Sequence, residues 1–252
     1  MKIRDKVAIV TGAAAGIGRA TAVMLAENGA RGVVLADLDE AGLQETVTLV
    51  TAAGAEAVPA ATDVTRLDAL RQMYRTADET FGQIDIVFNN AGIVSGPPPF
   101  PDTDVARVKL VLEIDLTSVI VSSQLAIQYM RDHGGGVIVN TASTGGLNPY
   151  LADAPYAAAK AGVIMFSRSC GDLKDQEGIR VNAVCPGVTE TPILDKTGGG
   201  QRPDWLGPIL EHIQILAPED IARAVVGIIE DDDMAGDFVV VQNQPKSEDL
   251  SR

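Results

Sequence analysis

The alternation of short apolar segments with longer helical ones restricts the fold of this chain more than any other feature. Seven short runs are rich in β-branched residues, at positions 7–10, 33–36, 57–61, 84–88, 137–141, 180–185 and 238–241. Most are apolar throughout, which is typical of parallel strands covered by helices on both faces. Segments with helical spacing separate them. The sequence therefore predicts an α/β protein, with one doubly wound domain of about seven parallel strands over residues 1–252.

Two connections interrupt this alternation, at 96–101 and at 193–216. In such sheets ligands bind beyond the carboxyl ends of the strands, so we expect both connections to flank an active site. The second is predicted to be a substrate lid, hinged near the glycines at 198–200. A helical hairpin packed permanently on the core is the alternative. The apolar residues of the lid are Trp205, Leu206, Ile209, Leu210, Ile213 and Ile215.

Charge and composition exclude several classes of function. The net charge of −14 repels phosphate backbones and anionic headgroups, which argues against nucleic-acid and membrane partners. No apolar run is expected to approach the ~20 residues that span a bilayer. Cys170 and Cys185 show no pairing pattern, the start of the chain lacks a secretory signal, and two histidines make no metal site. We expect a soluble cytoplasmic protein without a metal.

A glycine-rich turn follows the first predicted strand and opens a helix. Glycines let the backbone approach a pyrophosphate, whose charge a helix N-terminus favours. Asp37 ends the next strand, where a carboxylate can bind both adenosine ribose hydroxyls and repel a 2′-phosphate. NAD is therefore favoured over NADP. The alternatives are a glycine turn that binds no ligand, and Asp37 as a helix N-cap or turn residue. The turn reads Thr11-Gly12-Ala13-Ala14-Ala15-Gly16-Ile17-Gly18.

The spacing of these glycines resembles the T-G-x-x-x-G-x-G turn of the short-chain dehydrogenase/reductase superfamily, in its compact, Rossmann-like form. The resemblance extends over almost the whole chain. It implies that Asp63 and Val64 contact adenine, that the N-N-A-G motif lines the cofactor cleft, and that a P-G-x-x-x-T turn holds the nicotinamide carboxamide. The implied cofactor-binding residues are Gly12, Gly16, Ile17, Gly18, Asp37, Asp63, Val64, Asn90, Ala91, Gly92, Tyr156, Lys160, Pro186, Gly187, Thr189 and Thr191.

Tyr156 and Lys160 are four residues apart, on one face of a predicted helix, and Ser143 follows the fifth strand. Together they resemble the Ser…Tyr-x-x-x-Lys set of the family. The resemblance implies that Tyr156 is the general acid/base, with its pKa lowered by Lys160 and the nicotinamide. Lys160 would also hold the nicotinamide ribose, and Ser143 would bind the substrate oxygen.

The chain departs from the family pattern in two places. Asp115 replaces an asparagine whose carbonyl holds a water in a relay to the lysine. It is a candidate catalytic residue that adds negative charge, or else a buried structural residue. Gln242-Asn243-Gln244 replaces the common Asp-Gly-Gly, a segment that often joins a tetramer interface. The resemblance still implies a homo-oligomer, either a tetramer or a dimer through long helices.

The resemblance implies an oxidoreductase that moves a hydride between NAD(H) and a secondary alcohol or ketone. The apolar lid suggests a substrate with a hydrophobic body. Three alternatives remain open: a ketone reductase in the cell, a non-catalytic NAD-binding sensor or scaffold, and a nucleotide-sugar epimerase or dehydratase. The last also uses Tyr-x-x-x-Lys, but those relatives are longer and have a differently spaced glycine turn.

Overall fold

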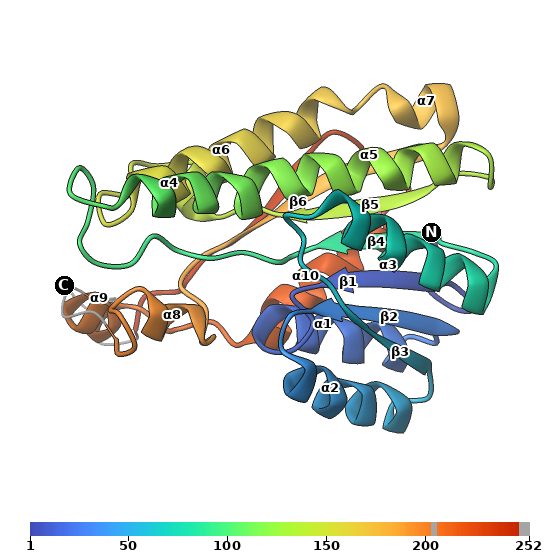
Figure 1. The fold of residues 1–252 in the computed structure, drawn as a ribbon, viewed down its shortest axis with the longest axis horizontal. Helices are drawn as coiled ribbons and strands as arrows, with labels where there is room; N and C mark the ends of the chain where they lie inside the picture. Colours follow the sequence, from blue (N-terminus) through green and yellow to red (C-terminus); the bar gives the residue numbers. More distant parts are fainter. Residues whose placement is uncertain (203–205, 247–252) are drawn as a thin grey trace.

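The computed structural model describes residues 1–202 and 206–246, and a single parallel sheet forms its centre (Figure 1). Its strands lie in the order β3-β2-β1-β4-β5-β6-β7. The seven predicted strands are all confirmed, with ends that differ by at most two residues. They are β1 (Val7–Thr11), β2 (Gly32–Asp37), β3 (Glu56–Ala61), β4 (Ile86–Asn89), β5 (Gly136–Thr141), β6 (Ile179–Pro186) and β7 (Phe238–Val241).

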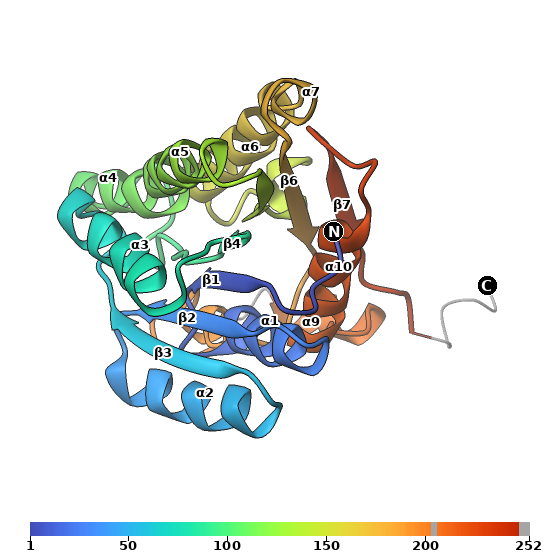
Figure 2. The same cartoon turned by 90° about the vertical axis from the view of Figure 1, so that its right-hand side faces the viewer.

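Helices cover both faces of the sheet, as the doubly wound prediction requires (Figure 2). One face is covered by α1 (Gly16–Glu27), α2 (Glu40–Ala52) and α10 (Pro218–Glu230). The other is covered by α3 (Leu67–Phe81), α4 (Val105–Leu112), α5 (Ser118–Arg131) and α6 (Ala154–Ser169). Shorter helical segments are η1 (Glu113–Thr117), η2 (Thr144–Gly146), α7 (Leu173–Glu177), α8 (Ile193–Lys196) and α9 (Leu206–His212).

Burial explains why the strands were readable from the sequence. Every residue of β1, β4, β5 and β6 is buried, because these central strands have helices on both sides. Strand β3 lies at one edge and is partly exposed. The strand order reverses between β1 and β4, so the connections from these two strands run to opposite sides. This reversal opens a crevice at their carboxyl ends, where ligands of such folds bind.

A longer apolar helix than expected lies beside the sheet. The run Val105–Arg131, made of α4, η1 and α5, has 27 residues and is long and apolar enough to cross a membrane by length and composition alone. The expectation that no apolar run approaches that length was therefore wrong. Part of its apolar surface serves the core, since Val119, Ala126 and Met130 of α5 are buried, whereas Val105, Leu110 and Ile120 are exposed.

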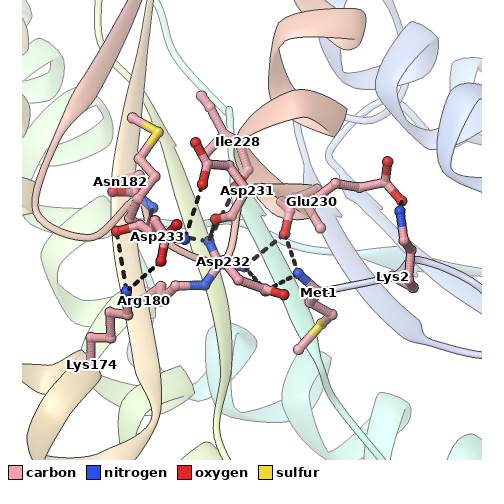
Figure 3. Close-up of polar contacts among 12 residues, drawn as sticks. Met1, Lys2, Lys174, Arg180, Asn182, Ile228, Glu230, Asp231, Asp232 and Asp233 are labelled. Atoms are coloured by element: carbon pink, nitrogen blue, oxygen red, sulfur yellow. Dashed lines mark hydrogen bonds and ion pairs between the residues drawn. The ribbon is translucent and has the colours of Figure 1, made fainter.

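A buried guanidinium closes the C-terminal end of α10 (Figure 3). Arg180, on β6, donates to the carbonyls of Ile228 at 3.1 Å, Ile229 at 2.6 Å and Asp231 at 2.7 Å. The amino group of Met1 also donates to the Ile229 carbonyl, at 3.0 Å. The last carbonyls of a helix have no partner inside it, so these donors satisfy groups that would otherwise be unpaired. They fix α10, which follows the connection 193–216.

Candidate active site

A cavity of about 630 Å³ lies at the carboxyl ends of the strands. It extends from Asp37, at the end of β2, past the glycine turn to Tyr156 on α6 and to the turn 186–191 after β6. The structure thus brings together every predicted site residue except Gly18. Those in the wall are Gly12, Gly16, Ile17, Asp37, Asp63, Val64, Asn90, Ala91, Gly92, Asp115, Ser143, Tyr156, Lys160, Pro186, Gly187, Thr189 and Thr191.

The glycine turn has the geometry that an approaching phosphate needs. Gly12 and Gly16 have φ of 64° and 53°, in the region that favours glycine. A Cβ on Gly12 would lie 2.8 Å from the Asn90 Nδ2 atom. The N-cap of α1 is Ala15, whose methyl group cannot accept a hydrogen bond, so the first-turn amides remain available to an anion in the cavity. These residues fit the pyrophosphate of a dinucleotide.

Gly18 was predicted to bind the cofactor, but it lies beneath the turn and not in the cavity wall. A Cβ at this position would lie 2.0 Å from the carbonyl oxygen of Gly12. The missing side chain therefore allows α1 to pack closely against the turn. Gly18 shapes the site by packing, and its contact with the cofactor stays a prediction.

Asp37 ends β2, which lies on the other side of β1 and β4 from β5 and β6. Its carboxylate accepts from the amides of Ala14 at 3.1 Å, Leu38 at 2.7 Å and Asp39 at 3.1 Å. The N-cap of α2 is Asp39, so Asp37 does not cap that helix. A carboxylate offers about four acceptor positions, which leaves capacity for further donors from the cavity.

The two asparagines after β4 hold different parts of the site. Asn89 is buried and donates to Asn140 Oδ1 on β5 at 2.9 Å. Asn90 donates its amide to Thr11 Oγ at 2.9 Å, and its side chain donates to the Thr11 carbonyl at 3.1 Å. Asn89 therefore braces the sheet, and Asn90 joins the turn after β4 to the end of β1.

Tyr156, Ser143 and Lys160 form a compact cluster at the other end of the cavity. The Lys160 ammonium is buried, donates to the Thr141 carbonyl at 3.0 Å and lies 5.5 Å from the centre of the Tyr156 ring. Ser143 Oγ accepts from the Gly145 amide at 3.1 Å, and Ser143 is near enough to the Tyr156 hydroxyl to lower its pKa. The cluster can therefore present a phenol and a hydroxyl to one substrate oxygen.

The pKa of Tyr156 is raised in the chain alone, chiefly by burial and then by the negative charge of Asp115. The hydrogen bond with Ser143 lowers this pKa, but by less. Lys160 is not among the causes that lower this pKa in the chain alone, because its ammonium lies 3.3 Å from the Asp115 carboxylate, which balances its charge. The lowering expected from Lys160 together with a bound nicotinamide stays a prediction.

Asp115 is fully buried within the π-helical turn η1. One carboxylate oxygen accepts from the Ile93 amide at 2.8 Å, and the other faces Lys160. Burial raises the pKa of Asp115, while the charge of Lys160 opposes that rise. The contact with the Ile93 amide is consistent with a structural role for Asp115, because it holds the loop after β4. The contact with Lys160 is consistent with a role in catalysis, because it places a negative charge beside the ammonium.

The segment 193–216 contributes apolar residues to the cavity. Ile193, Leu194, Leu206 and Ile209 line it, from α8 and α9, which lie beyond the carboxyl ends of the strands (Figure 1). The loop 96–101 lies against this segment, since a Cβ on Gly199 would lie 3.1 Å from the Pro97 ring. The segment 193–216 therefore flanks the cavity directly, whereas the loop 96–101 is adjacent to that segment and contributes no residue to the cavity wall. Trp205 falls outside the described residues.

Sequence reasoning missed Asp153, which caps the helix that carries Tyr156. Its carboxylate accepts from the Tyr156 amide at 3.1 Å, the Ser95 amide at 2.6 Å and the Ser95 hydroxyl at 2.7 Å. It is buried, so it ties the loop after β4 to the first turn of α6. An aspartate three residues before Tyr156, with Pro155 between them, is a helix N-terminal signal that could have identified it.

We expect Asp153→Ala to lower the free energy of unfolding by about 2–4 kcal/mol, because it removes a helix cap and leaves buried Ser95 donors unpaired. Asp104→Ala is the matched control: Asp104 caps α4, but it is exposed. That change should cost about 1 kcal/mol. Urea denaturation measures the free energy of unfolding of both variants. Equal decreases in the two variants would show that the contact with Ser95 does not stabilise the protein.

Comparison with known proteins agrees with this geometry. Residues 6–201 match the family model described as short chain dehydrogenase. The chain is 39% identical to cis-4-hydroxycyclohexanecarboxylate dehydrogenase of Sinomonas cyclohexanicum, over 94% of this chain and 92% of the relative. It is 34% identical to the bovine (Bos taurus) 15-hydroxyprostaglandin dehydrogenase [NAD(+)], over 94% and 90%.

The crystal structure of levodione reductase superposes with a TM-score of 0.86 at 30% identity, and the match covers 99% of each chain. Sequence, fold and cavity therefore lead to one family. The chain belongs to the short-chain dehydrogenase family and is an oxidoreductase that acts on alcohols or ketones.

Proposed function

We propose that the protein is an NAD-dependent dehydrogenase of secondary alcohols, with Tyr156 as its general acid/base. One observation carries this proposal: the cluster of Tyr156, Ser143 and Lys160 shares a single cavity with Asp37 and the glycine turn. NAD, when bound, supplies the carbon that takes up or returns the hydride. The same residues serve ketone reduction in the reverse direction.

Each residue of the cluster has a task that its contacts support. Tyr156 takes the hydroxyl proton of the alcohol during oxidation and returns it during reduction. Ser143 hydrogen-bonds the substrate oxygen, where charge changes during the reaction. Lys160 holds the nicotinamide ribose and receives its own orientation from the Thr141 carbonyl and Asp115.

In this proposal the other residues of the cavity wall each bind a different part of the dinucleotide. Asp37 would bind the adenosine ribose, and Asp63 and Val64 the adenine. The turn at Gly12, Gly16 and Ile17 would hold the pyrophosphate, and the segments 90–92 and 186–191 the nicotinamide end. The choice of NAD is supported by the carboxylate of Asp37, which disfavours a 2′-phosphate, and by a relative whose name specifies NAD(+).

We infer a substrate whose hydroxyl is carried on an aliphatic ring or a comparable hydrophobic body. The cavity that contains Tyr156 is lined in part by apolar side chains, among them Val94, Ile193, Leu206 and Ile209. A relative is named for a hydroxycyclohexanecarboxylate. In this proposal residues 1–252 form one catalytic domain, and the segment 193–216 is a lid that covers the bound substrate.

Location and assembly belong to the same proposal. We propose a cytoplasmic homo-oligomer, a dimer or a tetramer. A groove on α5 and α6 supports contact between copies through these helices; it is lined by Ile120, Ile127 and Phe166 together with Gln124, Gln128 and Arg131.

A substitution at the proposed base tests catalysis directly and separates an enzyme from an NAD-binding sensor. Tyr156→Phe should lower kcat by about 10²–10⁴-fold and leave NADH binding in place, because it removes only the hydroxyl. Tyr150→Phe is the control, since Tyr150 also lines the cavity with its ring 6.1 Å from that of Tyr156. NADH absorbance during oxidation of cyclic secondary alcohols gives the rates. Full turnover by the Tyr156 variant would contradict the assignment.

The choice of cofactor is tested at the other end of the cavity. Asp37→Ala should weaken NADH binding by about 10–100-fold, because hydrogen bonds to a charged group are lost, and should reduce discrimination against NADPH. Glu40→Ala removes a nearby exposed charge and should change neither affinity. Fluorescence titration measures both cofactors. Tighter binding of NADPH than of NADH by the unaltered protein would overturn the role of Asp37.

The pH profile should depend on Asp115. Oxidation needs ionised Tyr156, so kcat/KM rises with pH through its pKa, and the negative charge of Asp115 raises that pKa. Asp115→Asn removes this charge and leaves Lys160 unbalanced, so the rising limb should move to lower pH by about 0.5–1 unit. Glu113→Gln, exposed in the same turn, should leave the limb in place. If the rising limb of the kcat/KM profile of the Asp115 variant stayed at the same pH or moved to higher pH, this electrostatic role would be refuted.

A further inference from the structure

The segment that follows β7, residues 242–246, differs from the pattern common in the family, and its one half-buried side chain is Asn243. The Asn243 amide pairs with the backbone of Val188 in both directions. Its oxygen accepts from the Val188 amide at 2.7 Å, and its nitrogen donates to the Val188 carbonyl at 2.7 Å. The same nitrogen donates to the Gln214 carbonyl at 3.0 Å. One side chain therefore joins the turn after β6 to the trailing end of the lid.

Backbone hydrogen bonds extend this junction. The Leu216 amide donates to the Val188 carbonyl at 3.0 Å, and the Glu190 amide donates to the Leu216 carbonyl at 2.8 Å. On the other side, the Gln214 amide donates to the Gln244 carbonyl at 2.8 Å. The trailing end of the lid thus lies between the turn and the segment after β7, with bonds to both.

The turn is shaped to receive Asn243. A Cβ on Gly187 would lie 2.2 Å from the Asn243 Oδ1 atom, closer than any side chain allows. The Gly187 amide itself donates to the Val241 carbonyl, at 2.9 Å. Gly187 therefore leaves the space that the amide occupies, and the position of the turn depends on the fit between these two residues.

This turn lines the end of the cavity that contains Tyr156, whereas Asp37 lies at the opposite end. A displacement of Val188 and its neighbours would therefore disturb a ligand's reactive end and leave its adenosine end in place. The same displacement would loosen the lid where it returns to α10.

We propose that Asn243 is a positioning residue that fixes, through one amide group, both the turn at the nicotinamide end of the cavity and the trailing end of the lid. The inference rests on the proposed function in one respect only, namely that the cavity binds NAD. The geometry of the junction does not depend on the cofactor.

The test compares NADH with ADP-ribose, which has the adenosine end but lacks the nicotinamide. Asn243→Ala should weaken NADH binding about tenfold, as expected for the loss of hydrogen bonds worth about 1.4 kcal/mol, and should leave ADP-ribose binding unchanged. Gln242→Ala, at the exposed neighbouring residue, should change neither affinity. A variant that was merely misfolded would lose affinity for both ligands. Equal decreases in the affinities for NADH and ADP-ribose, or an unchanged affinity for NADH, would therefore overturn the proposal.

A second variant keeps the shape of the side chain. Asn243→Asp retains an acceptor for the Val188 amide but loses both donations to carbonyls, so it too should weaken NADH more than ADP-ribose. NADH affinity equal to that of the unaltered protein would show that the donations do not matter and would overturn the role of the amide.

Hydrogen–deuterium exchange provides a measurement without any cofactor. In Asn243→Ala the amides of 187–191 and 213–216 should exchange faster, while those of β1 and β4 keep their protection. Unchanged exchange would refute the junction itself. Failure of the unaltered protein to bind NADH would instead refute the proposed function, so the two failures can be told apart.

Discussion

The site is organised around a buried pair of opposite charges, Lys160 and Asp115. Removing two ions from water is costly, and the attraction between them compensates only when other hydrogen bonds satisfy their remaining groups. Here the Thr141 carbonyl accepts from the ammonium, and the Ile93 amide donates to the carboxylate. The pair therefore connects α6, the end of β5, the loop after β4 and the turn η1. These are the segments that surround Tyr156, so the position of the phenol and its pKa depend on the same contacts.

The topology of the sheet determines where these contacts can meet. Because the strand order reverses between β1 and β4, the segments after β1, β2 and β3 lie on one side of the crevice, and those after β5 and β6 lie on the other. The first group provides the glycine turn and Asp37, and the second provides Ser143 and the turn 186–191. A long ligand can therefore bridge both halves of the sheet, with its two ends recognised by different elements.

The strands and most of the cavity wall could be predicted from the sequence, because both depend on local patterns. Fully apolar runs identify central strands, and the family motifs place Tyr156, Asp37 and the turn residues together. What the sequence could not show depends on partners far apart in the chain. In the chain alone the pKa of Tyr156 is raised, chiefly because the fold buries the phenol and secondly because it brings the charge of Asp115 near. The contact of Asp153 with Ser95 spans 58 positions. The close packing of Gly18 against the Gly12 carbonyl is likewise seen only in the fold, because in the sequence a glycine needed for packing looks the same as one needed for ligand binding.

The fit between Gly187 and Asn243 has a consequence for the evolution of this protein. A residue with a side chain at 187 could be accommodated only after the amide at 243 had been lost, and a small residue at 243 would leave the carbonyl and amide of Val188 to find other partners. The two positions are therefore expected to co-vary across descendants and relatives. If a segment containing one of these two positions were replaced by that of a homologue, the protein would tolerate it only when the other position was replaced from the same homologue.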